Sequence, residues 1–294
     1  MPTLSIIIVS FNARNRLNDC LSSVFDASSN MDVEVIVVDN HSVEDIAGLV
    51  NEKYKAVRYI QNRENLGFAK ACNQGLGVCR GEYVLFLNPD TVVTEGVFEK
   101  CVRFMKEHPD AGGLGVRMMN GNGKYLKESK RGFPTIKASF GKMLGLYRLF
   151  PHSRFFSSYY MGHLSQHETN EVEVLSGAFL MMPSHLAKQL GGFDERFFMY
   201  AEDIDLSYRI QQAGYKNYYY SEVTITHIKG ESTPLQTAVY TNHFYGAMQQ
   251  YISKHYAHQT IKRTILHMLV FIAKGRAHVK RVVVALFKKN LTSF

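Results

Sequence analysis

Three carboxylates gather where a helix is expected to begin, within the stretch GGFDERFFMYAEDIDLSYRIQQAGY at residues 191–215. Glu202, Asp203 and Asp205 follow a loop rich in glycine and aromatic residues. A carboxylate within hydrogen-bond reach of a hydroxyl group can act as a general base. The same acids also suit a structural role, because they complement the positive end of a helix dipole and Asp205 can pair with Arg209 one turn later.

Two further acids follow apolar runs that have the pattern of buried strands. Asp39 comes after residues 33–38, and Asp90 comes after residues 83–87, within the sequence Asn-Pro-Asp-Thr. In parallel α/β sheets, ligands bind at the carboxyl ends of the strands. Asp39 could accept a hydrogen bond from a ribose hydroxyl or a pyrimidine ring N–H, and Asp90 could ligate a hard cation that also binds diphosphate oxygens. The structural alternative for the Asn-Pro-Asp-Thr segment is a proline-led turn before the next helix.

The N-terminal part of the chain alternates apolar strands with amphipathic helices. The continuous β-branched run at residues 4–10 is typical of a parallel strand covered on both faces, and Asn12 is expected to cap the helix that follows. The same alternation predicts strands at 33–38, 57–60, 83–87 and 112–117, and helices around 46–50, up to Cys79, and at 94–107. This order predicts an α/β fold with a right-handed, Rossmann-like, mainly parallel sheet flanked by helices.

The second half of the chain has a less regular pattern. Residues 128–170 are rich in Phe, Tyr, Arg and Ser without a sustained period, which is compatible with a substrate loop. A strand is expected at 171–175, continued to Phe179 by small residues that allow close approach of the backbone, and a last strand is expected at 218–225. Beyond residue 235 the sequence predicts a helical extension with helices at 240–252, 261–272 and 278–287.

Composition excludes several classes of protein. The 294 residues are 46% apolar, which is enough for a substantial core. The glycine patterns of dinucleotide-binding and P-loop proteins are missing. The four cysteines contain no C-x-x-C, so buried free thiols are expected rather than a zinc site or disulfides. The first apolar run lacks a basic preceding region, so it is expected to be a strand rather than a signal peptide.

Positive charge is concentrated at the C-terminal end. The formal net charge is +8, yet no Asp or Glu follows Glu231, whereas nine Lys and Arg residues do. The most apolar run of this tail, residues 264–272, is about half of the ~20 residues that a membrane-spanning helix needs. The tail is expected either to lie on an anionic membrane surface or to pack on the body with a solvated basic side. Nucleic-acid binding is not expected, because the basic residues alternate with aliphatic ones.

Seven segments in this order resemble the family 2 glycosyltransferases of GT-A fold. They lie at residues 10–12, 38–40, 65–69 with Asn73, 87–90, 176–178, 192–195 and 202–206. The resemblance covers residues 4 to about 235 and is strongest to the rhamnosyltransferase-type branch that builds bacterial cell-surface polysaccharides. The chain has no tryptophan and therefore lacks the Q-x-x-R-W motif of the processive synthases, so addition of a single sugar is expected.

The resemblance implies roles for particular residues. Asp203 would be the catalytic base with Glu202 beside it, and Asp39 would bind the base of a nucleotide-sugar. Asp90 would hold Mg²⁺ or Mn²⁺ together with His227, although a lone histidine at a strand end is otherwise usually an ordinary polar residue. Nucleotide-sugar contacts are expected from Ser10, Asn12, Asp39, Asn65, Gly67, Asn73, Asn88 and Asp90, with Arg63 and Lys229 as further cations that could instead be solvated surface residues; sugar or acceptor contacts are expected from Ser176, Gly177, Phe198 and Tyr200.

Two hypotheses about function follow. The first is an inverting, metal-dependent glycosyltransferase that moves one sugar from a UDP- or dTDP-sugar, dTDP-rhamnose among them, to a lipid-linked or polysaccharide acceptor at the cytoplasmic face of the cell membrane. The second is a catalytically silent relative that binds nucleotide or glycan within an assembly. The expected domains are a GT-A domain at 1–235, with a nucleotide-sugar-binding half at 1–117 and an acceptor half at 118–235, and a basic helical extension at 236–294. The sequence identifies neither the sugar, the acceptor nor the oligomeric state.

Overall fold

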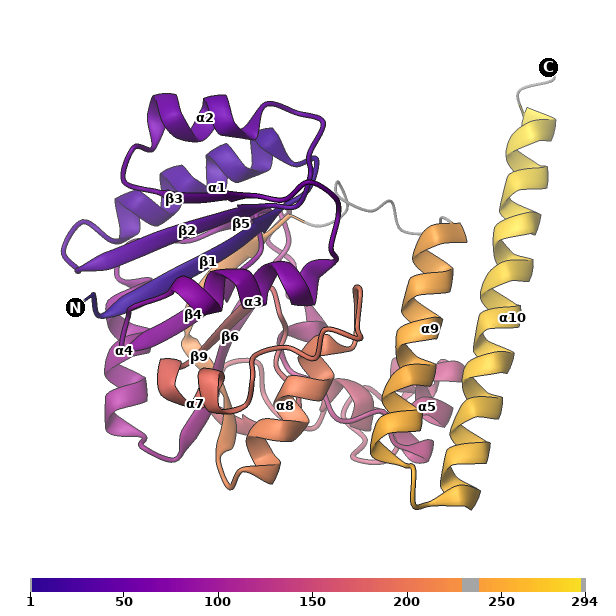
Figure 1. Cartoon of the computed structure of the whole chain (residues 1–294). Coiled ribbons are helices and arrows are strands. Elements are labelled where there is room, and N and C mark those ends of the chain that lie inside the picture. Colours follow the sequence, from indigo (N-terminus) through magenta and orange to yellow (C-terminus); the bar gives the residue numbers. More distant parts are fainter. Residues whose placement is uncertain (1, 229–237, 292–294) are drawn as a thin grey trace.

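The computed structural model describes residues 2–228 and 238–291, which form one mixed sheet with helices on both faces and two long helices beside it (Figure 1). The strands are β1 (Leu4–Ser10), β2 (Val33–Asp39), β3 (Arg58–Gln61), β4 (Tyr83–Leu87), β5 (Thr91–Val92), β6 (Ala111–Met119), β7 (Asn170–Val172), β8 (Phe179–Pro183) and β9 (Lys216–His227). The helices are α1 (Arg14–Ala27), α2 (Ile46–Lys53), α3 (Phe68–Val78), α4 (Val97–Glu107), α5 (Ile136–Met143), α6 (Leu146–Leu149), α7 (Ser184–Gln189), α8 (Glu202–Gln212), α9 (Ala238–His255) and α10 (Thr260–Leu291), with 3₁₀ turns at Lys127–Ser129 and Ser158–Tyr160.

The sheet has the strand order β3-β2-β1-β4-β8-β6-β9-β5, and β7 also pairs with β9. The strands β3, β2, β1 and β4 are parallel, and β6 and β9 pair in parallel beyond the antiparallel strand β8. The register places Ser10 of β1 beside Asp39 of β2, which in turn lies beside Gln61 of β3. The predicted α/β fold with a mainly parallel sheet is confirmed, and the register brings the carboxyl ends of three strands to one edge.

The strand β1 is a continuous apolar run because the core covers both of its faces. All seven of its residues are buried. Leu4, Ile6 and Ile8 belong to the core on the side of α1, α2 and α4, whereas Ile7 and Val9 belong to the core on the side of α3, α7 and α8. Successive side chains of a strand point to opposite faces, so a strand covered on both sides must be apolar throughout. The four cysteines are buried and free, as expected.

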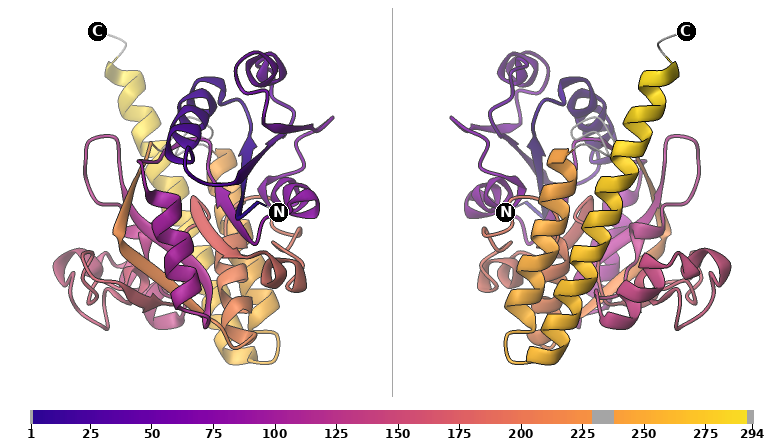
Figure 2. Two further views of the ribbon diagram at one scale, coloured as in Figure 1. Left: turned by 90° about the vertical axis from the view of Figure 1, so that its left-hand side faces the viewer. Right: turned by 90° about the vertical axis from the view of Figure 1, so that its right-hand side faces the viewer.

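A third apolar cluster joins α9 to the second half of the sheet domain. Ala247, Met248 and Tyr251 of α9 pack with Val174 and with residues of the segment that leads into α8. The helix α10 packs on α9 and on α5, and Figures 1 and 2 show these helices side by side. None of the helices within the described residues has a stretch long and apolar enough to cross a membrane.

Two predictions about the elements were wrong. The strand expected at 171–179 is two strands, because β7 pairs with β9 whereas β8 pairs with β4 and β6, and residues 173–178 cross between these positions. The two helices expected at 261–272 and 278–287 are one helix, α10. The linking sequence Ala-Lys-Gly-Arg-Ala contains a single glycine, which costs a helix only about 1 kcal/mol.

Candidate active site

Asp39 lies at the carboxyl end of β2 and is only 1% exposed. Its Oδ1 accepts a hydrogen bond from Ser42 N at 3.0 Å, and its Oδ2 accepts one from the Tyr59 hydroxyl at 3.0 Å. Burial, followed by the Asp39 charge, raises the pKa of Tyr59, so the phenol stays a donor. Each carboxylate oxygen can accept more than one hydrogen bond, so Asp39 keeps acceptor capacity for a ligand N–H or O–H.

Asn40, the next residue, organises the loop before α3. Its Nδ2 donates to Asn65 Oδ1 at 2.8 Å, and its Oδ1 accepts from Leu66 N at 3.0 Å and from Asn62 Nδ2 at 3.1 Å. Asn65 Oδ1 also accepts from Gly67 N at 3.0 Å. The sequence reading gave Asn40 no role of its own, although a second polar residue after a buried strand was a visible signal. Asn40 therefore fixes the shape of the loop that carries two of the predicted nucleotide-sugar contacts.

Gly67 marks the place where the loop meets the second half of the domain. Its φ is 85°, and a Cβ there would lie 2.6 Å from the carbonyl oxygen of Phe198. Phe68 N donates to the same carbonyl at 2.8 Å. Glycine is thus required both for the positive φ and for the close approach. The predicted donor loop and the predicted acceptor segment are in direct contact.

The predicted cap at Asn12 is wrong. The helix α1 starts at Arg14 and has no side-chain cap. Asn12 has a φ of 51°, outside the extended conformation of an N-cap residue, and its Oδ1 accepts from Val43 N at 2.9 Å. This hydrogen bond connects the loop after β1 with the loop after β2.

Two other predicted nucleotide-sugar contacts differ in exposure. Ser10 Oγ is buried and has no hydrogen-bond partner among the described residues, whereas Arg63 is exposed.

Asp90 and His227 come together, as the resemblance implied. The pairing of β5 with β9 places Thr91 beside His227, and Ile228 N donates to Asp90 O at 2.8 Å. Asp90 Oδ1 lies 3.1 Å from His227 Nε2, with side chains that are 12% and 7% exposed. The Asn-Pro-Asp-Thr segment is also a turn, because Thr91 Oγ1 donates to Asn88 O at 2.6 Å. The structural interpretation of this segment as a turn is therefore confirmed, and the cation site stays a prediction.

The Asp90–His227 pair fits a divalent cation only as part of a larger ligand set. His227 Nδ1 is buried without a hydrogen-bond partner among the described residues, and Asp90 Oδ1, although it lies close to His227 Nε2, forms no hydrogen bond of good geometry there. Within residues 2–228 and 238–291, no third His, Cys, Asp or Glu joins them in a ligand group. Cations such as Mg²⁺ are commonly held by one or two protein ligands together with substrate phosphates and water. One carboxylate and one imidazole suit a cation of this kind that shares its coordination with a diphosphate.

Asp203 is the second residue of α8. Its Oδ2 accepts hydrogen bonds from an Arg131 guanidinium nitrogen at 2.5 Å and from Gly177 N at 3.2 Å, and its Oδ1 accepts from Ile204 N at 2.8 Å. The side chain is 14% exposed. The carboxylate is therefore held in one orientation by three donors while part of it stays accessible to an acceptor hydroxyl.

Arg131 was missed by sequence reasoning. It lies in the irregular segment 128–170, 72 positions from Asp203, where no local sequence pattern predicts a site residue. Arg131 also donates to Leu175 O at 2.8 Å, and its backbone bridges Val174. Burial disfavours its charge, but Asp203 and Tyr159 outweigh burial and raise the pKa of Arg131. The guanidinium neutralises Asp203 and positions its carboxylate.

The segment at residues 176–178 connects the two acidic sites. Gly177 N donates to Asp203 Oδ2, and the next residue, Ala178, accepts from Asn88 N through its carbonyl oxygen at 3.0 Å. Ser176 Oγ accepts from Ala178 N at 3.3 Å. Hydrogen bonds thus connect the turn that carries Asp90 with the Asp203 carboxylate at the start of α8.

Glu202 differs from Asp203 in its surroundings. It is 7% exposed, and its Oε2 has no hydrogen-bond partner among the described residues. Burial, and then the Asp203 charge, raises the pKa of Glu202 to about 8. At neutral pH this side chain therefore carries a proton, and it complements the carboxylate of Asp203 rather than adding a second negative charge.

Asp205 has the structural role that its spacing predicted, together with partners that the sequence did not reveal. Arg209 Nε donates to Asp205 Oδ2 at 2.7 Å, which confirms the pair one turn apart. On the other side, Lys254 Nζ and His255 Nε2 of α9 bind Asp205 Oδ1 at 2.5 and 2.6 Å. Burial opposes these contacts, but together they lower the pKa of Asp205. Lys254 also binds Asp194 Oδ2 at 2.7 Å, so α9 is clamped to the start of α8.

The aromatic residues before α8, Phe197, Phe198 and Tyr200, differ in how exposed they are. Phe197 is 1% exposed and belongs to the core, whereas Phe198 is 38% exposed and stacks on His243 at a centroid distance of 5.1 Å. Tyr200 and Ala201 have φ angles of 72° and 65°. Such left-handed conformations are strained for residues other than glycine. Phe198 is thus placed where a ligand could reach it, whereas Tyr200 is half-buried and its ring packs on Phe244 at a centroid distance of 5.8 Å.

Two predicted contacts differ from the others. Asn73 binds the loop before α8, since Nδ2 donates to Phe193 O at 2.8 Å and Oδ1 accepts from Phe193 N at 2.9 Å. Its side chain therefore acts here as a clamp between α3 and residues 193–195. Lys229 lies outside the described residues.

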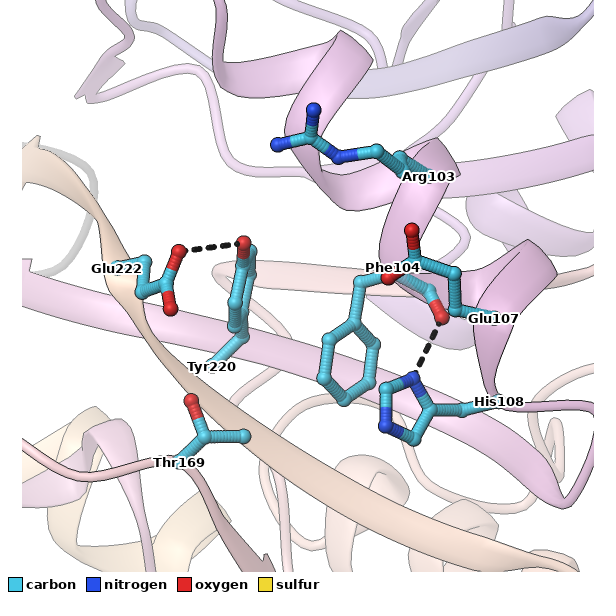
Figure 3. Close-up of a pocket in the computed structure, with 7 residues that line it drawn as sticks. All are labelled: Arg103, Phe104, Glu107, His108, Thr169, Tyr220 and Glu222. Atoms are coloured by element: carbon cyan, nitrogen blue, oxygen red, sulfur yellow. Dashed lines mark hydrogen bonds between the residues drawn. The ribbon is translucent and has the colours of Figure 1, made fainter.

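A surface hollow lies apart from these residues. Figure 3 shows it between α4 and β9, with the hydrogen bond from Tyr220 to Glu222 on one side and that between His108 and Phe104 O on the other. None of the predicted site residues lines it. The candidate site is thus defined by the strand ends and the start of α8, not by this hollow.

Solved structures share this architecture. The crystal structure of S. aureus TarS 1-349 aligns with a TM-score of 0.57 at 18% identity, over 85% of this chain and 64% of that chain. The crystal structure of GalNAc-T7 with UDP, GalNAc and Mn²⁺ aligns with a TM-score of 0.62 at 15% identity, over 86% of this chain and 51% of that chain. The sheet, its flanking helices and the acids at its strand ends therefore define a GT-A fold.

Sequence comparisons identify the family. Residues 5–182, more than half of the chain, match the family model described as Glycosyl transferase family 2. The N-acetylglucosaminyl-diphospho-decaprenol L-rhamnosyltransferase of Mycobacterium tuberculosis H37Rv is 27% identical over 241 residues, which cover 78% of this chain and 77% of the relative. The poly(ribitol-phosphate) β-N-acetylglucosaminyltransferase TarP of Staphylococcus aureus N315 is 33% identical over 133 residues, 44% of this chain and 41% of the relative. The chain belongs to glycosyltransferase family 2 and is a glycosyltransferase.

Proposed function

We propose that this enzyme is an inverting, metal-dependent glycosyltransferase that adds one sugar from a UDP- or dTDP-sugar, with dTDP-rhamnose as the first candidate, to a lipid-linked or polysaccharide acceptor. The observation that carries the proposal is the hydrogen-bonded connection from the Asp90 turn through residues 176–178 to Asp203. One relative is named an N-acetylglucosaminyl-diphospho-decaprenol L-rhamnosyltransferase. The similarity to this relative supports both a rhamnose donor and a lipid-linked acceptor.

In this proposal Asp203 accepts the proton of the acceptor hydroxyl as its oxygen bonds to the anomeric carbon. The bond between that carbon and the diphosphate oxygen breaks, and the nucleoside diphosphate leaves from the opposite face, which inverts the configuration. Arg131 and Gly177 N hold the carboxylate in place during the transfer. Phe198 and Tyr200 form one wall for the acceptor or its sugar.

On the donor side, Asp39 binds the uracil or thymine ring N–H, which both bases share. Asn40 and Asn65 shape the loop around it, and Ser10 Oγ is a free polar group at the same strand edge. Asp90 and His227 would hold a Mg²⁺ or Mn²⁺ ion, which would stabilise the negative charge of the departing diphosphate. Arg63 and Lys229 remain proposed cations for the diphosphate.

We also propose that residues 1–235 are the catalytic domain, with a nucleotide-sugar-binding half at 1–117, and that residues 236–294 are an extension that contacts an anionic membrane. Because Lys254 and His255 of α9 bind Asp205, α9 stabilises the acceptor half. With a lipid-linked acceptor, the enzyme would work at the inner face of the cell membrane.

The test is to measure release of nucleoside diphosphate from UDP- and dTDP-sugars with Mg²⁺, with Mn²⁺ and with a chelator. We expect release to need the cation, and Asp90→Asn and His227→Gln to raise the metal concentration that gives half-maximal activity. His108→Gln, in the separate hollow, is the matched control and should behave like the wild type. Full activity in excess chelator would refute metal dependence, and no release from any nucleotide-sugar would favour a catalytically silent relative.

A further inference from the structure

Exposed large apolar side chains concentrate on two segments of this chain. Of the thirteen such side chains on the described residues, ten belong to residues 140–155 or 261–279. Single exposed apolar residues are ordinary on a protein surface, whereas a cluster indicates an interaction site. The first segment contributes five of them, with Leu149 73% exposed and the others between 43% and 51%: Phe140, Leu144, Leu149, Phe150 and Phe155.

The second segment forms a stripe along α10. Ile261, Met268, Ile272 and Val279 follow one another at intervals of seven, four and seven residues, a spacing that places them on one face of a helix. Leu266 and Leu269 are buried instead. Thus α10 has one apolar face that packs inside the protein and a second that remains exposed, with Phe271 beside it.

The two segments belong to one surface. The helix α10 packs on α5, and Arg276 of α10 donates to Met143 O at 3.1 Å. Figures 1 and 2 show α5 beside α9 and α10. Residues 140–155 continue directly from α5 through α6. The exposed apolar side chains therefore gather on a composite surface made by α5–α6 and α10, which we name the α5–α10 surface.

The charge of the α5–α10 surface is one-sided. No Asp or Glu occurs from residue 129 to 167, and none occurs after Glu231. Arg148, Arg154, Lys262 and Arg276 are exposed. A second copy of the same chain would bring these cations against one another, so charge complementarity points to an anionic partner.

We propose that the α5–α10 surface docks on an anionic lipid bilayer, with the side chains of residues 140–155 and the outer stripe of α10 entering the headgroup region together. Apolar side chains flanked by Lys and Arg are the combination that binds such an interface. The proposal rests on the proposed function, whose acceptor is lipid-linked, and it adds a second membrane-contacting segment to the tail. Because α9 joins α10 to α8, docking holds the acceptor half and its base next to the bilayer.

The experiment is sedimentation of the full-length protein with phosphatidylcholine vesicles that contain or lack phosphatidylglycerol. Wild type should bind the anionic vesicles, and added salt should weaken binding. Two double variants, Leu149→Ser with Phe150→Ser and Met268→Ser with Ile272→Ser, should each lower the partition coefficient about tenfold or more, because each removes two large apolar side chains. Val43→Ser, whose side chain is 89% exposed elsewhere, is the matched control and should bind like the wild type.

The proposal would be overturned if the double variant at Leu149 and Phe150 bound anionic vesicles as strongly as the wild type does. It would also be overturned if the wild type did not bind anionic vesicles. A change of oligomeric state in the double variants, measured by size-exclusion chromatography with light scattering, would show that a second copy covers the surface and would also overturn it. Hydrolysis of UDP- and dTDP-sugars in solution needs no bilayer, so it should persist in both double variants. Its absence in the wild type would refute the proposed function without changing the vesicle result.

Discussion

Asp39 at the end of β2 and Asp205 in the first turn of α8 are both buried carboxylates with different kinds of partner. Asp39 is bound by a backbone N–H and a tyrosine hydroxyl, which carry no charge. Asp205 is bound by Arg209, Lys254 and His255. Neutral partners leave the charge of Asp39 available to a ligand, whereas Arg209 and Lys254 neutralise the charge of Asp205, and Lys254 and His255 join α9 to α8. Asp203 lies between these cases, because among the described residues Arg131 is the cation that pairs with it.

The largest expected effect comes from breaking the Asp205 cluster. Asp205→Ala should lower the free energy of unfolding by about 3–5 kcal/mol, because it removes the buried carboxylate that Arg209, Lys254 and His255 share. The measurement is chemical denaturation followed by circular dichroism. Asp110→Ala is the control, because Asp110 pairs with Lys216 at 3.0 Å on the surface with both side chains almost half exposed. An equal effect of the two substitutions would contradict the structural role of Asp205.

The neutral network around Asn40 should be less costly to break. Asn40→Ala removes the acceptor of Leu66 N and a partner of Asn65 and Asn62. Leaving such buried groups unpaired should cost about 1–3 kcal/mol and should weaken nucleotide-sugar binding, measured by calorimetry. Asn12→Ala, at an exposed position with a bond to Val43 N, should destabilise the protein less. If Asn40→Ala bound the nucleotide-sugar with unchanged affinity, the loop before α3 would not contribute to donor binding.

The last expected effect concerns Glu202 and, unlike the other two, depends on pH. The folded protein holds this carboxyl's pKa at about 8, above the ordinary value of 4.5. Between these values the unfolded chain releases the proton and the folded chain keeps it, so stability falls as pH rises through this window and the full penalty remains above pH 8. Glu202→Gln removes the penalty, so the substitution should stabilise the protein at alkaline pH, and its advantage over the wild type should shrink as the pH falls towards 5. Melting temperatures of both proteins from pH 5 to 9 test this, and a constant difference would contradict it.

The sequence predicted the parts of the fold in which local pattern and burial coincide. The strands β1, β2 and β4 were located within a residue or two, because strands buried on both faces are continuous apolar runs. Asp90 and His227 were brought together as the resemblance implied. The split between β7 and β8 was missed because it depends on which strands they pair with, and such partners are distant in the sequence.

The charged partners in the acceptor half could not be predicted for the same reason. Arg131 lies 72 positions from Asp203, and Lys254 lies 49 positions from Asp205. Spacing rules such as the i, i+4 pair of Asp205 and Arg209 reach only one helical turn. Only tertiary packing brings the irregular segment and α9 to the start of α8, so the structure was needed to complete the site.

The most direct test of the proposed mechanism compares Asp203→Asn with the wild type in both transfer and donor binding. Transfer should fall by about 10²–10⁴-fold, the usual contribution of a general base, while the affinity for the nucleotide-sugar should be unchanged because the proposed role of Asp203 concerns the acceptor. The amide keeps the size of the side chain and can still accept from Arg131 and Gly177 N. Transfer at the wild-type rate by Asp203→Asn would contradict the assignment of Asp203 as the base.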